Sequence, residues 1–334
     1  MPVGQTNRRE FIAALSGAAA AWPVVARGQT VDRMRRIGLL STSAEDDEEA
    51  AKRFAAFRLR LQELGWSEGK NLRIDVRFGN NNGQPIRQAA SELIAVAPDA
   101  IVSTTSTTNR ALMDATSNIP IVAAVSGDPI LLGFTKSLSN PTKNITGFTT
   151  FNDTVAAKRF EMLREIVPTM HTAALIWVQV NPQQVLLETQ TREAAQALGI
   201  ELLSLPVKAA TDIPPALAMA HNHRASALIV AADPLTIANG RAIIDGCVSM
   251  RLPAIHTFAF EAKNGALMSY GIDLVESYRR TAEYIDRILK GTKIADLPFQ
   301  EPTRLTLVIN LQTARALGVS IPSTLLAQAD EVIE

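Results

Sequence analysis

Hydroxyl and acidic residues follow several short apolar runs of this 334-residue chain, in places where they could bind a small polar ligand. The clearest group is 103–108 (STTSTT), six consecutive hydroxyl residues between an apolar run and a helical pattern. Such a turn presents hydroxyls and free backbone N–H groups to an anion, so it could hold a carboxylate without a cationic side chain. Helix capping is the alternative interpretation, although a cap alone would use only one of the six.

Two acids occupy similar places in the two halves of the chain, since Asp128 and Asp233 each follow an apolar run and precede a proline. Either carboxylate could bind an ammonium group across a cleft, and either could instead cap a helix or begin an Asp-Pro turn. Three aromatic residues, Phe258, Phe260 and Tyr270, could form an apolar wall for a ligand, with core packing as the alternative. These residues and the hydroxyl turn are the candidate binding residues.

Motifs for catalysis are missing from the sequence. The histidines at 171, 221, 223 and 256 are scattered, and no H-E-x-x-H, G-x-S-x-G, P-loop or strand-linked G-x-G-x-x-G motif occurs. The single cysteine, Cys247, lies in a predicted amphipathic helix and is expected to be a buried structural thiol. We therefore predict a protein that is not an enzyme and that has no cofactor and no metal site.

Alternating β-branched runs and amphipathic helices must position these residues, which is the pattern of repeated βα units. Two such series, split near residue 150, indicate an α/β fold with two doubly wound lobes. In open sheets of this kind, ligands bind beyond the carboxyl ends of the strands, where the candidate residues fall. The predicted strands are 36–40, 72–78, 100–103, 120–125, 145–149, 173–178, 201–206, 227–231, 254–257, 266–270 and 305–309. The predicted helices include 86–97, 109–117, 155–167, 183–198, 214–221, 236–250, 274–290 and 311–317.

The composition fits a globular chain of about two domains and excludes several function classes. Lys+Arg and Asp+Glu both number 33, so no basic excess is available for neutralising the phosphates of a nucleic acid. One cysteine excludes an intramolecular disulfide framework. No segment beyond the N-terminal region approaches the ~18 consecutive apolar residues that a membrane span needs.

The first 28 residues are typical of an export signal. Arg8 and Arg9 form a basic start, 11–22 is a short apolar run rich in Ala, and Ala26 and Gly28 are small residues suited to cleavage near Gly28. The segment 6–12 (TNRREFI) resembles a twin-arginine signal, with an ordinary secretion signal as the alternative. Removal of three arginines and one glutamate with the signal leaves 30 basic and 32 acidic residues, a net charge of −2. We predict a periplasmic location.

Short stretches spread in order over nearly the whole chain resemble the periplasmic substrate-binding components of ABC transporters. The resemblance is closest to the family that includes the tryptophan/tyrosine-binding proteins. The stretches are 8–12, 54–65, 119–122, 127–129, 144–147, 232–234, 267–271, 288–291 and 307–311.

This resemblance implies a type I periplasmic-binding fold, in which two Rossmann-like lobes are joined by three crossover strands. The first lobe would hold residues 31–147 plus 272–302, and the second 148–271 plus 303–334. The crossings are expected near 147–148, 271–273 and 302–305. In such proteins a ligand that touches both lobes shifts an open–closed equilibrium toward the closed form.

The resemblance also suggests which residues bind the ligand. Thr105 and Ser106 would bind its carboxylate, assisted by Ser41 from the first strand-end loop. Asp233, with Asp128 as the other candidate, would bind its ammonium group.

By the same resemblance, Phe258 and Tyr270 would line the pocket for the ligand's side chain. The ligand would be an amino acid, aromatic or otherwise, or a similar small carboxylate. The partners would be this ligand and an ABC permease in the inner membrane, and the binding protein would be a monomer. A ligand-presenting sensory module for a membrane receptor or kinase is the alternative, followed by an exported enzyme.

Overall fold

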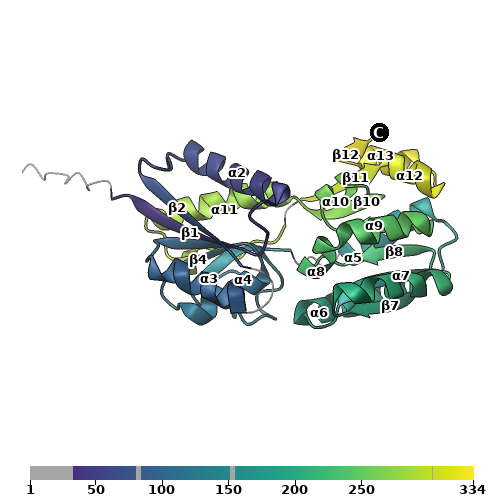
Figure 1. The fold of residues 1–334 in the computed structure, drawn as a ribbon, viewed down its shortest axis with the longest axis horizontal. Coiled ribbons are helices and arrows are strands. Elements are labelled where there is room, and N and C mark those ends of the chain that lie inside the picture. The colour runs from purple at the N-terminus through teal and green to yellow at the C-terminus, as the bar shows by residue number, and fades with distance from the viewer. Residues whose placement is uncertain (1–32, 80–83, 151–154, 303) are drawn as a thin grey trace, which may run out of the picture. The chain divides into compact units, whose positions relative to one another are not determined.

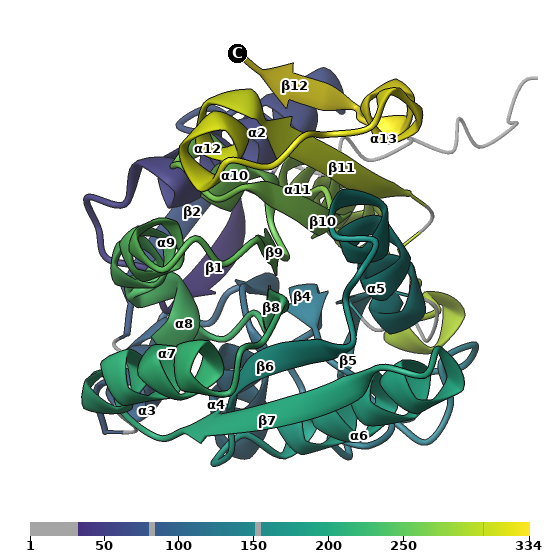
Figure 2. The same ribbon diagram turned by 90° about the vertical axis from the view of Figure 1, so that its right-hand side faces the viewer.

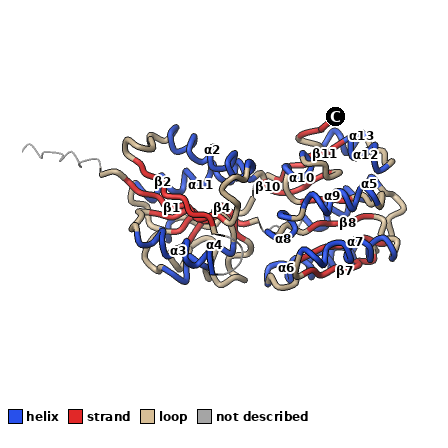
Figure 3. The backbone as a smooth tube through the Cα atoms, viewed as in Figure 1, coloured by secondary structure: helices blue, strands red, loops and turns tan. Residues whose placement is uncertain are grey.

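Two separate β-sheets organise the chain. The computed structural model describes residues 33–79, 84–150, 155–302 and 304–334, and the predicted export signal lies outside these ranges. Figure 1 shows the two sheets with their covering helices, and Figure 3 shows the strands in red. In the described part of the chain, no helix is both long and apolar enough to cross a membrane.

The first sheet is five-stranded and wholly parallel, in the order β2-β1-β3-β4-β5. Helices α2 and α11 pack together over one face and helices α3 and α4 over the other. Helix α11 therefore returns to the first sheet after a strand of the second. The strands are β1 (Arg35–Ser41), β2 (Leu72–Phe78), β3 (Ala100–Ser103), β4 (Ile121–Ser126) and β5 (Ile145–Thr149), and the helices are α2 (Glu48–Glu63), α3 (Gln84–Ala95), α4 (Ser106–Ala115) and α11 (Leu274–Leu289).

The second sheet has seven strands in the order β12-β11-β10-β9-β8-β6-β7. The run from β10 to β7 is parallel, whereas β11 is antiparallel to β10 and parallel to β12. The strands are β6 (Thr172–Val178), β7 (Glu201–Val207), β8 (Ala227–Val230), β9 (Ala254–His256), β10 (Met268–Ile272), β11 (Leu305–Asn310) and β12 (Glu331–Ile333).

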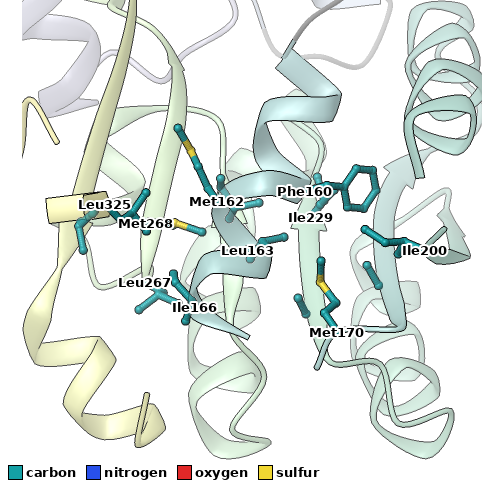
Figure 4. Packing of buried hydrophobic residues seen from close by; sticks show 14 of the residues in the cluster. Phe160, Met162, Leu163, Ile166, Met170, Ile200, Ile229, Leu267, Met268 and Leu325 are labelled. Atoms are coloured by element: carbon teal, nitrogen blue, oxygen red, sulfur yellow. The ribbon is translucent and has the colours of Figure 1, made fainter. Parts of the chain in front are cut away.

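Helices cover both faces of this sheet, as Figure 2 shows. Figure 4 shows one face of its core, where Phe160 and Leu163 pack toward Ile229 of β8. The helices are α5 (Val155–Ile166), α6 (Pro182–Ala197), α7 (Ile213–Asn222), α8 (Pro234–Ala238), α9 (Gly240–Ser249), α10 (Ala259–Lys263), α12 (Leu311–Leu317) and α13 (Ser323–Gln328).

Local sequence explains where individual helices begin. Helix α2 starts at Asp47, whose carboxylate accepts a hydrogen bond from the Ala50 N–H at 3.0 Å, and acids occupy its first turn, where the helix dipole favours them. The prediction of one helix over 236–250 was wrong, because α8 and α9 are separate. Helix α8 begins at Pro234, two positions before the predicted start, and Asp233 is its N-cap. Asn239 is both the C-cap of α8 and the N-cap of α9.

The start predicted for helix α4, residue 109, was three residues too late. Thr105 caps α4, so Ser106 and the residues that follow form its first turn. The sequence pattern also missed the short elements α10, α13 and β12, whose few residues carry too little periodicity to be distinguished from loops.

The connections between the sheets run close together at the end of β5. Residue Phe148 bridges to Gln300, with Gln300 N donating to the Gly147 carbonyl and Thr149 N donating to the Gln300 carbonyl, each at 2.9 Å. The antiparallel strand β11 begins five residues later. Backbone hydrogen bonds thus join two connecting segments that are about 150 residues apart in sequence.

Gly147 is tightly enclosed, and its substitution should destabilise the protein. Its φ is +141°, and an added Cβ would lie 2.1 Å from the Ala123 carbonyl oxygen. We expect Gly147→Ala to lower the free energy of unfolding by at least about 2 kcal/mol, because both backbone strain and strand displacement are imposed. Gly199→Ala is the matched control, since Gly199 has φ +66° with nothing near its Cβ position, and it should cost about 1 kcal/mol. Equal losses in urea unfolding would contradict this explanation.

Candidate ligand-binding site

Several hydrogen bonds of the hydroxyl turn after β3 are made within the turn itself. The Thr105 hydroxyl accepts from Thr108 N at 3.3 Å, so Thr105 is the N-cap of α4. In return, the Thr108 hydroxyl accepts from Thr104 N, Thr105 N and the Ser103 hydroxyl, at 3.0, 2.9 and 2.6 Å. The capping alternative therefore accounts for Thr105 and Thr108.

Ser106 faces a different environment from its neighbours. Its hydroxyl accepts from Gly127 N at 2.9 Å, which ties the turn after β3 to the loop after β4. The same hydroxyl lies 3.4 Å from Oε1 of Gln183 in α6. A Cβ added to Gly127 would lie 1.9 Å from the end of the Gln183 side chain, so a larger residue would displace that side chain from Ser106. Ser106 is thus placed where loops from both sheets meet.

Each of the two candidate acids stabilises a local turn. The Asp128 carboxylate accepts from Ile130 N at 2.8 Å and from Leu131 N at 3.1 Å. Asp233 is buried, caps α8 by accepting from Leu235 N at 2.9 Å, and also accepts from Asn181 Nδ2 at 2.8 Å. Because Asn181 follows β6 and Asp233 follows the neighbouring strand β8, this bond joins two strand-end loops.

The aromatic candidates divide into a loop residue and a strand residue. Phe258 follows β9, is 7% exposed, and stacks on Phe260 with ring centroids 5.8 Å apart. Tyr270 lies within β10 and packs as a half-buried residue against the core of the second sheet. Both rings thus pack against other side chains, Tyr270 from a strand and Phe258 from the loop at a strand end.

A buried group of charged residues supports these aromatic positions, and the sequence interpretation missed it. Arg159 of α5 donates to the Tyr270 carbonyl at 2.8 and 3.2 Å and to the Thr257 hydroxyl at 3.0 Å. Glu261 of α10 accepts from the backbone N–H groups of Thr257 and Phe258 and pairs with His256 Nδ1 at 3.0 Å. These contacts fix the loop that carries Phe258.

Burial and charge oppose each other in this group. Burial lowers the pKa of the Arg159 guanidinium to about 10, although the nearby Glu261 carboxylate acts in the opposite direction. Burial alone would raise the pKa of Glu261, but the charge and hydrogen bond of His256 and the two backbone N–H groups outweigh it and lower the pKa below 4.5. Both side chains are therefore charged at neutral pH. His256 and the two backbone N–H groups stabilise the Glu261 carboxylate, and that carboxylate in turn favours the charged form of Arg159.

Sequence spacing contains the signal that could have revealed Arg159. Phe160, Leu163 and Ile166 are buried, and Arg159 lies four residues before Leu163 on the same helix face. A cation at a position expected to be apolar needs a buried partner.

Ser41, the remaining candidate, is buried at the end of β1, and its hydroxyl accepts from Ser43 N at 3.0 Å. Two further buried atoms at this edge, Asn109 Oδ1 and Ser126 Oγ, hydrogen-bond to nothing in the described part of the chain. The edge thus retains polar capacity beyond what its turns use.

A cavity of about 330 Å³ lies where the connecting segments meet. It is lined by the ends of β5 and β10, the first turns of α11, and Glu301, Pro302 and Arg304. Its volume is near the lower end of small-molecule sites. None of the seven predicted binding residues lines it.

The chemistry available at these loops is that of binding. Hydroxyls, carboxylates and aromatic rings are present, and Cys247 is buried as predicted. Within the described residues, no group of three or more His, Cys, Asp or Glu side chains could hold a metal ion.

Comparison with known proteins identifies the family of this chain. The sequence model of the ABC transporter substrate binding proteins matches residues 47–333. The chain belongs to this family. A curated relative of this substrate-binding protein is the tyrosine-binding protein of Clostridioides difficile strain R20291, which is 21% identical over 287 residues. That alignment covers 86% of this chain and 82% of the relative.

Solved structures give the fold of this substrate-binding protein. A conserved domain protein from Vibrio cholerae has a TM-score of 0.83 and 24% identity, over 90% of this chain and 100% of that one. An ABC domain in complex with L-Trp from Streptococcus pneumoniae has a TM-score of 0.83 and 22% identity, over 90% and 99%. The predicted α/β fold with two parallel-sheet lobes, the type I periplasmic-binding fold, is confirmed.

Removing the charge of Glu261 should change how stability depends on pH. We expect Glu261→Gln to lower the free energy of unfolding by about 3 kcal/mol at pH 7, because His256 Nδ1 loses its buried carboxylate partner and Arg159 loses a nearby negative charge. The folded-state pKa of Glu261 lies below the unfolded value of 4.5, so its contribution is complete above 4.5 and is lost as pH falls through the folded value. The difference in free energy of unfolding between wild type and variant should therefore become smaller below pH 4.5.

Urea unfolding at pH 7, 5, 4 and 3.5 measures this difference. Glu92→Gln is the control, since Glu92 is an exposed glutamate whose carboxylate contacts Arg77 and Gln88 at the surface. A difference that stays constant from pH 7 to 3.5 would show that the pKa of Glu261 is the same in the folded and unfolded protein, and would contradict its lowering.

Proposed function

We propose that this protein is the solute-binding component of an ABC importer and that its ligand is a small carboxylate, an aromatic amino acid. The observation that carries the proposal is family membership together with polar and aromatic strand-end loops on both sheets. Two similar proteins, a tyrosine-binding protein and a domain in complex with L-Trp, support an aromatic amino acid.

In this proposal the two ends of an amino acid bind to different loops. Ser41, Thr105 and Ser106 bind the carboxylate, and Asp233 binds the ammonium group. The buried position of Asp233 and its hydrogen bond from Asn181 support it over Asp128, which lies in a more exposed turn.

The side chain of the ligand would lie against Phe258 and Tyr270. The hydrogen bonds of Glu261 and Arg159 to this region support that role, because they hold the loop and the Tyr270 backbone before any ligand arrives. An aromatic ligand stacked on such a fixed wall loses less conformational freedom from the protein.

Binding would close two lobes, residues 31–147 plus 272–302 and residues 148–271 plus 303–334. The path of the chain supports this division, since α11 packs with α2 on the first sheet although it follows β10 of the second. The closed form would be recognised by the permease in the inner membrane, and the protein would act as an exported, periplasmic monomer.

Thermal unfolding with a ligand panel tests the proposal. We expect L-tyrosine or L-tryptophan to raise the melting temperature of purified protein lacking residues 1–28, because a ligand at 100 times its Kd adds ~2.7 kcal/mol to stability. Calorimetric titration then gives the affinity. The absence of a shift across amino acids, aromatic acids and nucleosides would refute the proposed function.

The same titration distinguishes the two candidate acids. Asp233→Asn keeps a helix cap but loses the charge and the acceptor for Asn181 Nδ2, so we expect amino-acid affinity to fall about 10- to 100-fold and the melting temperature of the ligand-free protein to fall as well. Asp128→Asn is the matched control and should leave affinity within about threefold. A larger loss from Asp128→Asn would assign the ammonium group to Asp128 instead.

A further inference from the structure

One arginine of helix α2 lacks the partner that its position requires. Ala50, Phe54 and Phe57 form the buried face of α2, and Arg53 lies three residues after Ala50 and four before Phe57 on that face. The Nε atom of Arg53 is fully buried and hydrogen-bonds to nothing in the described part of the chain.

The other arginines of this helix behave differently. Arg58 pairs with Glu68 at 3.3 Å, and Arg60 pairs with Glu63 and Glu283 at 2.9 and 2.8 Å. Among the residues that the structure describes, no carboxylate lies within ion-pair distance of Arg53. A guanidinium is charged at any accessible pH, so a partly buried one without an anion is costly.

The hydroxyl of Tyr278 lies near this cation at the carboxyl edge of the first sheet. The ring of Tyr278 lies 5.9 Å from that of Phe54, the residue next to Arg53. Burial raises the pKa of the Tyr278 hydroxyl to about 12; the charge of Arg53 and the hydroxyl of Thr104 oppose that rise, and the Asp47 carboxylate adds to it. Arg53, Thr104 and Asp47 therefore all lie near the Tyr278 hydroxyl, but Asp47 caps α2 and makes no ion pair with Arg53.

Ser41 belongs to the same group by strand register. β1 and β3 are parallel, with Leu40 opposite Ser103, so Ser41 and Thr104 are the next pair along the edge. Leu39 and Val102 belong to the core beneath α2 and α11, and the alternation of side chains places Ser41 and Thr104 on that face. Both residues are buried.

We infer that Arg53 is the cation that binds the carboxylate of the ligand, with the hydroxyls of Tyr278, Thr104 and Ser41 around it. This inference rests on the proposed function and changes its chemistry, because a carboxylate held only by hydroxyls and N–H groups becomes one held by a guanidinium. A carboxylate accepts two parallel N–H bonds from a guanidinium, which favours carboxylates over neutral ligands.

The state of the other carboxylate candidates supports this choice. The Thr105 hydroxyl already accepts from Thr108 N, and the Ser106 hydroxyl already accepts from Gly127 N. Both can assist a ligand, but neither needs one. Arg53 is the group at this edge whose charge an anion would balance.

Pairs of ligands that differ only in the carboxylate test the inference. Calorimetric titration would compare L-tyrosine with tyramine and L-tryptophan with tryptamine, on wild type, Arg53→Gln and Arg53→Lys. We expect Arg53→Gln to weaken binding of the amino acids by roughly 10- to 100-fold and to leave binding of the amines unchanged. Arg53→Lys should retain part of the affinity, because it keeps the charge without the bidentate geometry.

Two controls separate ligand binding from structure. Arg58→Gln removes an arginine of the same helix that already has a partner, and should not alter the preference for the amino acid over the amine. The melting temperature of ligand-free Arg53→Gln should equal or exceed that of wild type, because an unbalanced charge is removed. A fall would indicate a structural role and would overturn the inference.

The outcomes also separate this inference from the proposed function. Suppose that wild type binds the amino acids and that Arg53→Gln either weakens the binding of amino acid and amine equally or weakens the binding of neither. The proposed function then stands and the role of Arg53 is refuted. If wild type binds none of these ligands nor 3-(4-hydroxyphenyl)propionate, which keeps the carboxylate and lacks the ammonium group, both fail. Retained binding of that acid by Asp233→Asn together with its loss in Arg53→Gln would support both assignments.

Discussion

The burial of parallel strands on both faces determines where this protein can carry chemistry. Every residue of β3 and β8 is buried, and helices cover both faces of each sheet. Polar side chains cannot occupy such strands without losing water, so they collect at the strand ends. The hydroxyl turn after β3, Asp233 after β8 and Phe258 after β9 all follow from this constraint, and so does the role of the Thr105 and Asp233 side chains as caps.

Two arginines on inward helix faces show how the same physical requirement is met in different ways. Arg159 is fully enclosed, and the Tyr270 carbonyl, the Thr257 hydroxyl and the charge of Glu261 stabilise it. Arg53 is enclosed in part, its Nε has no hydrogen-bond partner, and no carboxylate of the described residues forms an ion pair with it. The described part of the protein thus supplies hydrogen-bond and charge partners for Arg159 that it does not supply for Arg53. This contrast is the reason to assign Arg53 to a ligand.

Much of the fold could be predicted from the sequence, because alternating apolar runs and amphipathic helices are a strong signal. The ends of helices and strands were harder to predict. Thr105 and Asp233 follow strands and also cap helices, and the pattern could not show whether their oxygens cap the helix or are free to bind a ligand. Neither Arg53 nor Arg159 was among the candidate residues. Their spacing relative to Phe57 and Leu163 carried the information, since it places both on apolar faces.

The two sheets differ in how far their loops are fixed before a ligand binds. Around Phe258, Glu261 holds two backbone N–H groups and Arg159 holds the neighbouring strand, so an aromatic ring would meet a surface already in place. Around Arg53, no carboxylate of the described residues forms an ion pair with the guanidinium, so an added anion would find a charge to balance. A ligand with both a carboxylate and an aromatic ring would therefore gain charge balance from one sheet and shape from the other. Discrimination between side chains would arise at the second sheet, and the requirement for a carboxylate at the first.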